Sequence, residues 1–327
     1  MATRASWRAH LVHWLVAARM RPYALRPIDP QWIRAKMGQP QSVRWLLASS
    51  TGARFGVRPP EGTWPGGEWA GCPEAGDAAP TVLYLHGGGY IGCSPATHRS
   101  LVGSLVQRIR GEAWVPQYRL APEHPFPAAL DDALAAYRFL LEARGVSPSR
   151  LIVAGDSAGG GLALALVHRL KADGVPLPAG VVTFSPWADL AATGASLDEN
   201  SDRCSMFAGD TIRRATCFYL GSADPYDPLV SPLYGEFAGF PPLLVHASLD
   251  EVLRDDAMRV AQRARDAGVL VESQWWPRVP HVWQFFPAVL PEARESLALA
   301  AAFVSRCLVR SDLGATPVTI ERPRPTA

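Results

Sequence analysis

The chain has 327 residues, of which 48% are hydrophobic and 19% are charged, so it can bury a sizeable core and is not disordered. Its 32 basic and 30 acidic residues leave a net charge of +2, which argues against a nucleic-acid-binding protein, because such proteins cluster Lys and Arg on one face. Five cysteines without a CxxC pair indicate neither a disulfide framework nor a zinc cluster.

The first element expected along the chain is an N-terminal helix. Apolar residues recur there at helical spacing, namely Trp7, Leu11, Trp14, Leu15 and Ala18. The apolar run over residues 11–18 is short, contains a histidine and leads to no small-residue cleavage site. We therefore predict a helix packed on its own protein, with a membrane-surface anchor or an export signal as alternatives. Because no run of about 18 apolar residues occurs, we expect no membrane insertion and a cytoplasmic protein.

Short apolar runs then alternate with segments of helical length. The expected strands cover residues 81–85, 113–115, 151–154, 181–184, 242–245 and 269–276. The expected helices cover residues 97–110, 128–144, 157–172, 252–267 and 292–307. Strands that alternate with helices require right-handed crossovers and give a mostly parallel sheet with helices on both faces. The fold class is therefore α/β, and chemistry is expected at the carboxyl ends of the strands.

Two segments interrupt this alternation. Residues 60–80 are rich in Gly and Pro and are expected to lie outside the core. Residues 195–239 contain no clear strand and are too long for a plain connection, so we expect an insertion with its own helix around residues 211–220. We expect this insertion to lie over the site together with the N-terminal helix.

Two glycine-rich motifs directly follow expected strands. In the first, residues 155–159 read Gly-Asp-Ser-Ala-Gly, and Ser157 stands on a sharp strand-to-helix turn that exposes its hydroxyl. In the second, residues 86–90 read His-Gly-Gly-Gly-Tyr, and the glycines leave N–H groups bare to approach an oxyanion. A phosphate cradle is the alternative for the second motif, but the Lys-Ser/Thr of a P-loop is missing. A flexible turn is the non-functional interpretation.

A serine hydroxyl needs a base to take its proton and a carboxylate to orient that base. The candidate carboxylates are Asp250, Glu251, Asp255 and Asp256. Asp250 is preferred because it lies in the loop after a strand, Glu251 is second, and the last two fall inside the next helix. Of the eight histidines only His281 lies beyond Asp250, in the loop after residues 269–276, and it is the expected base. His246 falls within a strand and is interpreted as a core histidine.

Together these motifs resemble the bacterial hormone-sensitive-lipase-like family of α/β-hydrolases, in the subgroup with a Gly-Asp-Ser-Ala-Gly elbow. The likeness also includes residues 118–123, which read Tyr-Arg-Leu-Ala-Pro-Glu, and residues 281–283, which read His-Val-Trp. The resemblance implies a serine carboxylesterase that acts on short- to medium-chain esters and needs no metal or organic cofactor. By position it assigns the triad to Ser157, Asp250 and His281, and the oxyanion hole to Gly87, Gly88 and Ala158.

The resemblance also implies a helical cap on the hydrolase core. The expected division is residues 1–45 for the N-terminal cap segment, 46–194 and 240–308 for the catalytic core, 195–239 for the cap insertion and 309–327 for a flexible tail. Candidate pocket residues are Tyr90, Trp187, Met206 and Phe207, of which the last two could instead only hold the cap down.

The expected partner is a small-molecule ester, and a homodimer through the edge strand 269–276 is a further expectation from the resemblance. Two other functions stay open. A lactone or amide hydrolase would use the same triad, and a non-catalytic receptor would share the fold. Plant gibberellin receptors resemble the same family but lack the catalytic histidine, so His281 favours an enzyme.

Overall fold

A twisted, mostly parallel sheet forms the centre of the molecule. The computed structural model describes residues 5–24, 26–37, 51–76 and 78–312, and within them eight strands pair in the order β1-β2-β4-β3-β5-β6-β7-β8. The strands are β1 (Arg54–Arg58), β2 (Gly67–Gly71), β3 (Thr81–Leu85), β4 (Glu112–Pro116), β5 (Leu151–Asp156), β6 (Gly180–Phe184), β7 (Leu243–Ser248) and β8 (Val271–Trp276). β2 runs antiparallel to both β1 and β4, and all other pairs are parallel.

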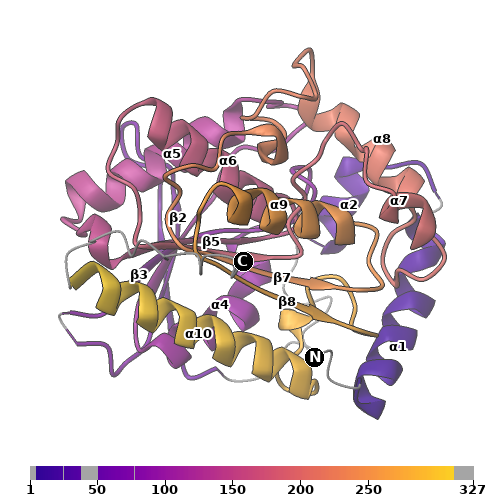
Figure 1. Cartoon of the computed structure of the whole chain (residues 1–327), viewed down its shortest axis with the longest axis horizontal. Coiled ribbons are helices and arrows are strands. Elements are labelled where there is room, and N and C mark those ends of the chain that lie inside the picture. Colours follow the sequence, from indigo (N-terminus) through magenta and orange to yellow (C-terminus); the bar gives the residue numbers. More distant parts are fainter. Residues whose placement is uncertain (1–4, 25, 38–50, 77, 313–327) are drawn as a thin grey trace, which may run out of the picture.

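Helices cover both faces of this sheet, as Figure 1 shows. The α-helices of the described residues are α1 (Trp7–Ala24), α2 (Pro30–Met37), α4 (Arg99–Ile109), α5 (Ala128–Arg138), α6 (Ala158–Ala172), α7 (Ser196–Glu199), α8 (Gly209–Leu220), α9 (Arg254–Asp266) and α10 (Pro291–Asp312). The α5, α6 and α9 helices pack on one face, and α4 and α10 pack on the other. The predicted α/β architecture is confirmed.

The central strands are buried on both faces because consecutive apolar side chains supply two cores. In β5, Val153 belongs to the core under α5 and α6, while its neighbours Ile152 and Ala154 belong to the core under α4 and α10. This is the period of two that a strand imposes on its side chains. A parallel strand covered by helices on both sides therefore has an uninterrupted apolar sequence.

The antiparallel end of the sheet was not predicted. β2 falls inside residues 60–80, which the sequence analysis placed outside the core, and this expectation is wrong because Gly67 and Ala70 are buried. A Cβ atom on Gly67 would lie 2.7 Å from the ring of Trp114 on β4, so glycine here permits close packing of strands. Trp69 packs on the same Trp114 ring, with centroids 5.1 Å apart.

The C-terminal boundary also differs from the expected one. α10 continues to Asp312, so residues 309–312 are helical and do not belong to a tail. The rest of the expected tail, residues 313–327, lies outside the described residues.

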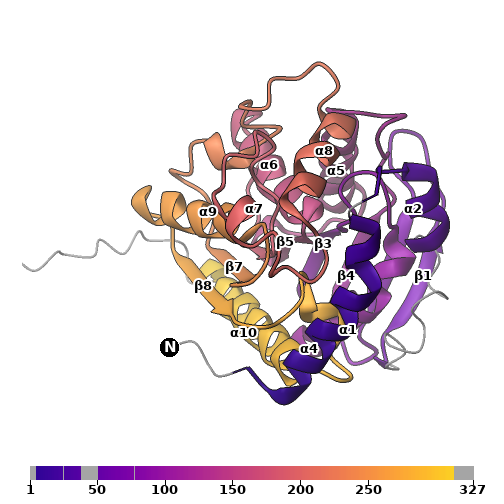
Figure 2. The ribbon, with the colours of Figure 1, turned by 90° about the vertical axis from the view of Figure 1, so that its right-hand side faces the viewer.

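The N-terminal helix and the 195–239 segment lie side by side (Figure 2). The Thr211 hydroxyl donates to the Ala24 carbonyl at 2.8 Å, and the Arg21 guanidinium donates to the Ser201 and Cys204 carbonyls at 2.8 and 2.7 Å. The helix expected around residues 211–220 is α8. Among the described residues, no helix combines the length and the apolar character required to cross a bilayer.

The contact face of α1 is the reverse of the predicted one. Its buried residues are Ala9, Val12 and Ala24, whereas Trp7, Leu11, Trp14 and Leu15, which define the predicted stripe, are exposed. The helix does pack on its own protein, as expected, but through small side chains on the opposite face.

Candidate active site

Ser157 stands between β5 and α6 in a conformation that few residues other than glycine adopt. Its φ is 52° and its ψ is −124°, and its backbone is held by a 2.9 Å bond from its N–H to the Phe184 carbonyl. A side chain on Gly159 would collide with the Leu85 carbonyl, and one on Gly155 would collide with Gly159. The flanking glycines therefore let strand and helix approach, and the surrounding structure maintains a strained turn that presents the serine side chain.

The imidazole of His281 contacts Glu251 and not Asp250. The His281 Nδ1 and Glu251 Oε2 atoms are 2.5 Å apart, and both side chains are buried. The other carboxylate oxygen of Glu251 accepts the Ser248 N–H at 2.9 Å. A buried carboxylate on Nδ1 fixes the ring orientation and leaves Nε2 as the free nitrogen. Nε2 of His281 is buried and has no hydrogen-bond partner among the described residues.

Asp250, the carboxylate preferred from the sequence, points elsewhere. Its Oδ2 accepts the Arg278 N–H at 2.7 Å, and its Oδ1 pairs with the Arg203 guanidinium at 3.2 Å. The expectation that it contacts His281 is wrong. Two adjacent carboxylates in a loop point in different directions, and the loop conformation decides which of them reaches the histidine.

Asn200, a buried residue just after α7, binds the loop between β7 and α9 that carries Asp250 and Glu251, here called the acid loop. Its Nδ2 donates both hydrogens, to the Leu249 carbonyl at 3.0 Å and to the Glu251 carbonyl at 2.9 Å. Asn200 is not among the residues predicted from the sequence, because nothing in the pattern around it distinguishes it from a polar loop residue.

Replacement of Asn200 by Ala is expected to lower kcat about 10- to 100-fold with a smaller change in KM, because the Glu251 backbone loses its support. The two buried carbonyls left without donors should also lower the free energy of unfolding by about 1–3 kcal/mol. Steady-state kinetics well below the unfolding temperature and urea denaturation measure the two effects. The matched control is Ser231→Ala, which removes a buried bond from the Leu190 N–H at 2.7 Å and should reduce stability but leave kcat unchanged. Equal kcat losses in both variants would contradict a positioning role.

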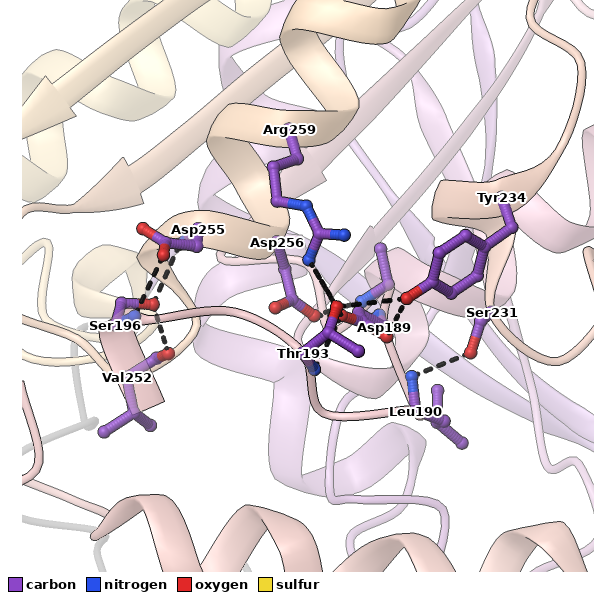
Figure 3. A network of polar contacts seen from close by, with 11 residues as sticks. Asp189, Leu190, Thr193, Ser196, Ser231, Tyr234, Val252, Asp255, Asp256 and Arg259 are labelled. Atoms are coloured by element: carbon purple, nitrogen blue, oxygen red, sulfur yellow. Dashed lines mark hydrogen bonds and ion pairs between the residues drawn. The ribbon is translucent and has the colours of Figure 1, made fainter. Parts of the chain in front are cut away.

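A second network holds the loop after β6 on α9, as Figure 3 shows. The Asp256 Oδ2 atom accepts the N–H groups of Ala188 and Asp189, each at 2.9 Å. Asp189 in turn accepts from the Arg259 guanidinium at 2.8 Å and the Tyr234 hydroxyl at 3.0 Å. Burial, together with the charge of Asp189, raises the pKa of Asp256 well above its usual value. Asp256 therefore lies within α9 and anchors the loop after β6 to that helix, which agrees with its exclusion as a triad member.

The same figure shows the tie between α7 and the acid loop. The Ser196 hydroxyl donates to the Val252 carbonyl at 2.7 Å, and its N–H donates to Asp255 at 2.9 Å. Val252, the residue after Glu251, is thus bound to the 195–239 segment. The 195–239 segment and the acid loop therefore form one hydrogen-bonded unit.

The three consecutive glycines after β3 do not have equivalent N–H groups. The Gly87 N–H donates to the Asp156 Oδ1 at 3.2 Å, so it is not free for an oxyanion. In the described part of the chain, no hydrogen bond takes up the N–H of Gly88, Gly89 or Ala158. The expectation for Gly87 is therefore wrong, and Gly89, which sequence reasoning left out, presents a free donor.

Asp156, next to the serine, links the two glycine motifs. Its buried Oδ1 accepts the Tyr84 hydroxyl at 2.8 Å in addition to the Gly87 N–H. Burial opposes its ionisation, but the charge and hydrogen bond of His98 and the bond from Tyr84 outweigh burial and lower the pKa of Asp156. A side chain on Gly87 would collide with this carboxylate. Asp156 thus fixes the loop that carries the free glycine N–H groups.

Of the four candidate pocket residues, one contacts the candidate base. The Phe207 ring meets the His281 ring edge-on, with centroids 5.3 Å apart. Tyr90 and Trp187 are buried in the core under α6, where Tyr90 stacks on Tyr219 at 3.6 Å. Met206 is half-buried beside Phe207 in the segment that leads to α8. No group of three or more His, Cys, Asp or Glu side chains in the described ranges has the arrangement of a metal site.

Comparisons with known proteins agree with this fold. The family described as having the alpha/beta hydrolase fold matches residues 82–285. An acetyl-hydrolase of Streptomyces hygroscopicus is 46% identical over 224 residues, which are 68% of this chain and 75% of that protein. The crystal structure of EstE5 soaked with ethyl alcohol superposes with a TM-score of 0.86 at 33% identity, over 93% of this chain and all of EstE5. An esterase from the bacterial hormone-sensitive lipase family superposes with a TM-score of 0.79 at 36% identity, over 94% of this chain and 100% of that one.

Proposed function

The chain belongs to the α/β-hydrolase family, in its bacterial hormone-sensitive-lipase-like branch, and from this premise we propose that it hydrolyses short- to medium-chain carboxylic esters through Ser157, His281 and Glu251. The observation that carries the proposal is the buried pair of His281 and Glu251, which leaves the imidazole Nε2 without a partner among the described residues. Glu251 replaces Asp250 as the acid of the triad.

The first half of the reaction acylates the serine. The Ser157 Oγ attacks the ester carbonyl while the His281 Nε2 takes the hydroxyl proton, and Glu251 stabilises the imidazolium through Nδ1. The free N–H groups of Gly88, Gly89 and Ala158 would meet the oxyanion, and each such donor contributes about 2.7–4 kcal/mol in enzymes of this type. His281 then protonates the leaving alcohol, which departs as the acyl-enzyme forms.

The second half regenerates the enzyme with water. His281 takes a proton from a water molecule, whose oxygen attacks the acyl carbon, and the same donors meet the second oxyanion. Collapse of that intermediate returns the proton to Ser157 and releases the carboxylic acid. The cycle consumes one ester and one water and yields one acid and one alcohol, so it requires no cofactor.

The assembly and location of the protein are separate proposals. We assign the cap to the N-terminal segment and residues 195–239, because side-chain to backbone hydrogen bonds join the two segments and tie residues 195–239 to the loop that carries Glu251. A homodimer through the edge strand β8 and a cytoplasmic location complete the proposal. Light scattering that gives the mass of one chain would refute the dimer, and recovery of the protein only from an exported fraction would refute the location.

A panel of p-nitrophenyl esters tests the substrate class. We expect kcat/KM for the acetate to hexanoate esters to exceed that for the dodecanoate by roughly tenfold or more, because large aromatic side chains such as Phe207 occupy the space beside the base. Comparable or faster turnover of the dodecanoate would contradict a short-chain esterase. The matched p-nitroanilides and lactones serve as controls, and faster turnover of either would favour an amidase or a lactonase.

A further inference from the structure

We propose that the outer face of α1 docks on the surface of an anionic lipid bilayer. This face is defined as Trp7, Leu11, Trp14 and Leu15, which are 69%, 45%, 63% and 41% exposed. Their spacing places all four on one side of the helix. Two exposed tryptophans and two exposed leucines on one helix face form an apolar patch of the kind that marks an interaction site. The proposal does not depend on the proposed enzymatic function.

The opposite side of α1 packs on the rest of the chain, so the helix cannot rotate to bury its outer face in the core. Ala9 is fully buried and Val12 nearly so, in a cluster with Trp276 and Trp283. The Ser6 N–H donates to the Glu292 carboxylate at 2.7 Å and fixes the start of the helix. The apolar residues of the outer face therefore have no place in the core of their own chain.

The charge of α1 selects an anionic partner. No acidic residue occurs from residue 1 to residue 28, and Arg8, Arg19 and Arg26 are exposed on or just beyond the helix. Tryptophan prefers the boundary between lipid headgroups and acyl chains, and arginine can place its apolar stem there while its charge reaches the headgroups. Exposed tryptophan and leucine on one helix face, with arginine nearby and no acidic residue, suit a helix that lies in the interface of an anionic bilayer.

A second copy of this chain fits the same face less well. In a twofold dimer the same patch would meet itself, so the arginines of one copy would lie close to those of the other. Such like-charge contacts oppose association. Anionic headgroups instead pair with the arginines while the indoles and leucines leave water.

Sedimentation of the full chain with vesicles of phosphatidylglycerol or of phosphatidylcholine tests the proposal. We expect the protein to sediment with phosphatidylglycerol and more weakly with phosphatidylcholine. The Arg8→Gln, Arg19→Gln double variant should bind phosphatidylglycerol more weakly, by about fivefold for each arginine. The Trp7→Gln, Leu11→Gln, Trp14→Gln variant should lose roughly tenfold or more in affinity, because its apolar contacts are gone.

The matched control replaces three exposed apolar residues elsewhere, Val57, Tyr226 and Leu270, which are 76%, 54% and 46% exposed. Their replacement by Gln should leave vesicle binding unchanged. Failure of the unmodified chain to bind either vesicle would overturn the proposal, as would unchanged binding by the outer-face variant. A dimer detected by light scattering that the outer-face variant dissociates would also overturn it and assign the face to a second copy.

Discussion

Ser157→Ala is expected to lower kcat for p-nitrophenyl butyrate on the order of a millionfold, because the variant has no nucleophile and retains only binding and the oxyanion donors. The protein should still fold. Alanine has the same Cβ as serine, so the strained backbone at φ 52° is no costlier in the variant, and the elbow contacts come from backbone atoms. Far-UV circular dichroism and the urea midpoint should match those of the unmodified chain.

Covalent labelling by a fluorophosphonate gives a second readout of the same serine. The unmodified chain should take up one label, and Ser157→Ala should take up none. The matched control is Ser185→Ala, since Ser185 also follows a parallel strand and also has a positive φ, of 48°, but is fully buried. That variant should still be labelled. Labelling that survives Ser157→Ala would place the nucleophile elsewhere and overturn the proposed mechanism.

The parts of the fold that the sequence predicted are those with a simple apolar pattern. The central parallel strands β3, β5 and β6 are buried on both faces and therefore stand out as largely apolar runs between helices. β1 has only exposed and half-buried residues, and β2 contains two glycines, so neither strand has such a run. Their positions depend on pairing with β4, which is a tertiary contact that no local pattern records.

The glycine motif shows a similar limit. Three consecutive glycines, residues 87–89, come shortly after β3, and the sequence does not tell which of their N–H groups are free to bind an oxyanion. The register of the sheet decides which of these N–H groups is occupied. Leu85 pairs with Gly155, and this brings Gly87 beside Asp156. The Asp156 carboxylate then takes the first N–H and leaves the next two. A carboxylate next to the serine was visible in the sequence, but its partner was not.

The periodicity of α1 predicted a helix and its apolar stripe but not what the stripe contacts. Helical spacing of Trp7, Leu11 and Trp14 would be the same for a core-facing helix and for one that binds an external surface. In the structure this stripe is exposed, and α1 packs on its own chain through the smaller residues Ala9 and Val12.

Glu251→Gln is expected to lower kcat on the order of 10⁴-fold, whereas Asp250→Asn should stay within about tenfold of the unmodified chain. The amide that replaces the Glu251 carboxylate would be nearly isosteric, but it could not stabilise the imidazolium and could hold His281 in the wrong tautomer. Asp250 instead contacts the N–H of Arg278 and the guanidinium of Arg203. Steady-state kinetics on p-nitrophenyl butyrate, with urea denaturation to exclude misfolding, measure both effects.

The two neighbouring carboxylates serve as controls for each other, because both are buried and both changes remove one negative charge. The difference in kcat between the two variants therefore measures the effect of the contact with His281. A large loss in Asp250→Asn with near-normal activity in Glu251→Gln would return the triad acid to Asp250 and would mean that the working loop differs from the one described. Equal, large losses would show that loop charge, and not the 2.5 Å contact, supports the base. A loss confined to Glu251→Gln is the result that the geometry requires, since only this carboxylate lies on Nδ1 of the ring.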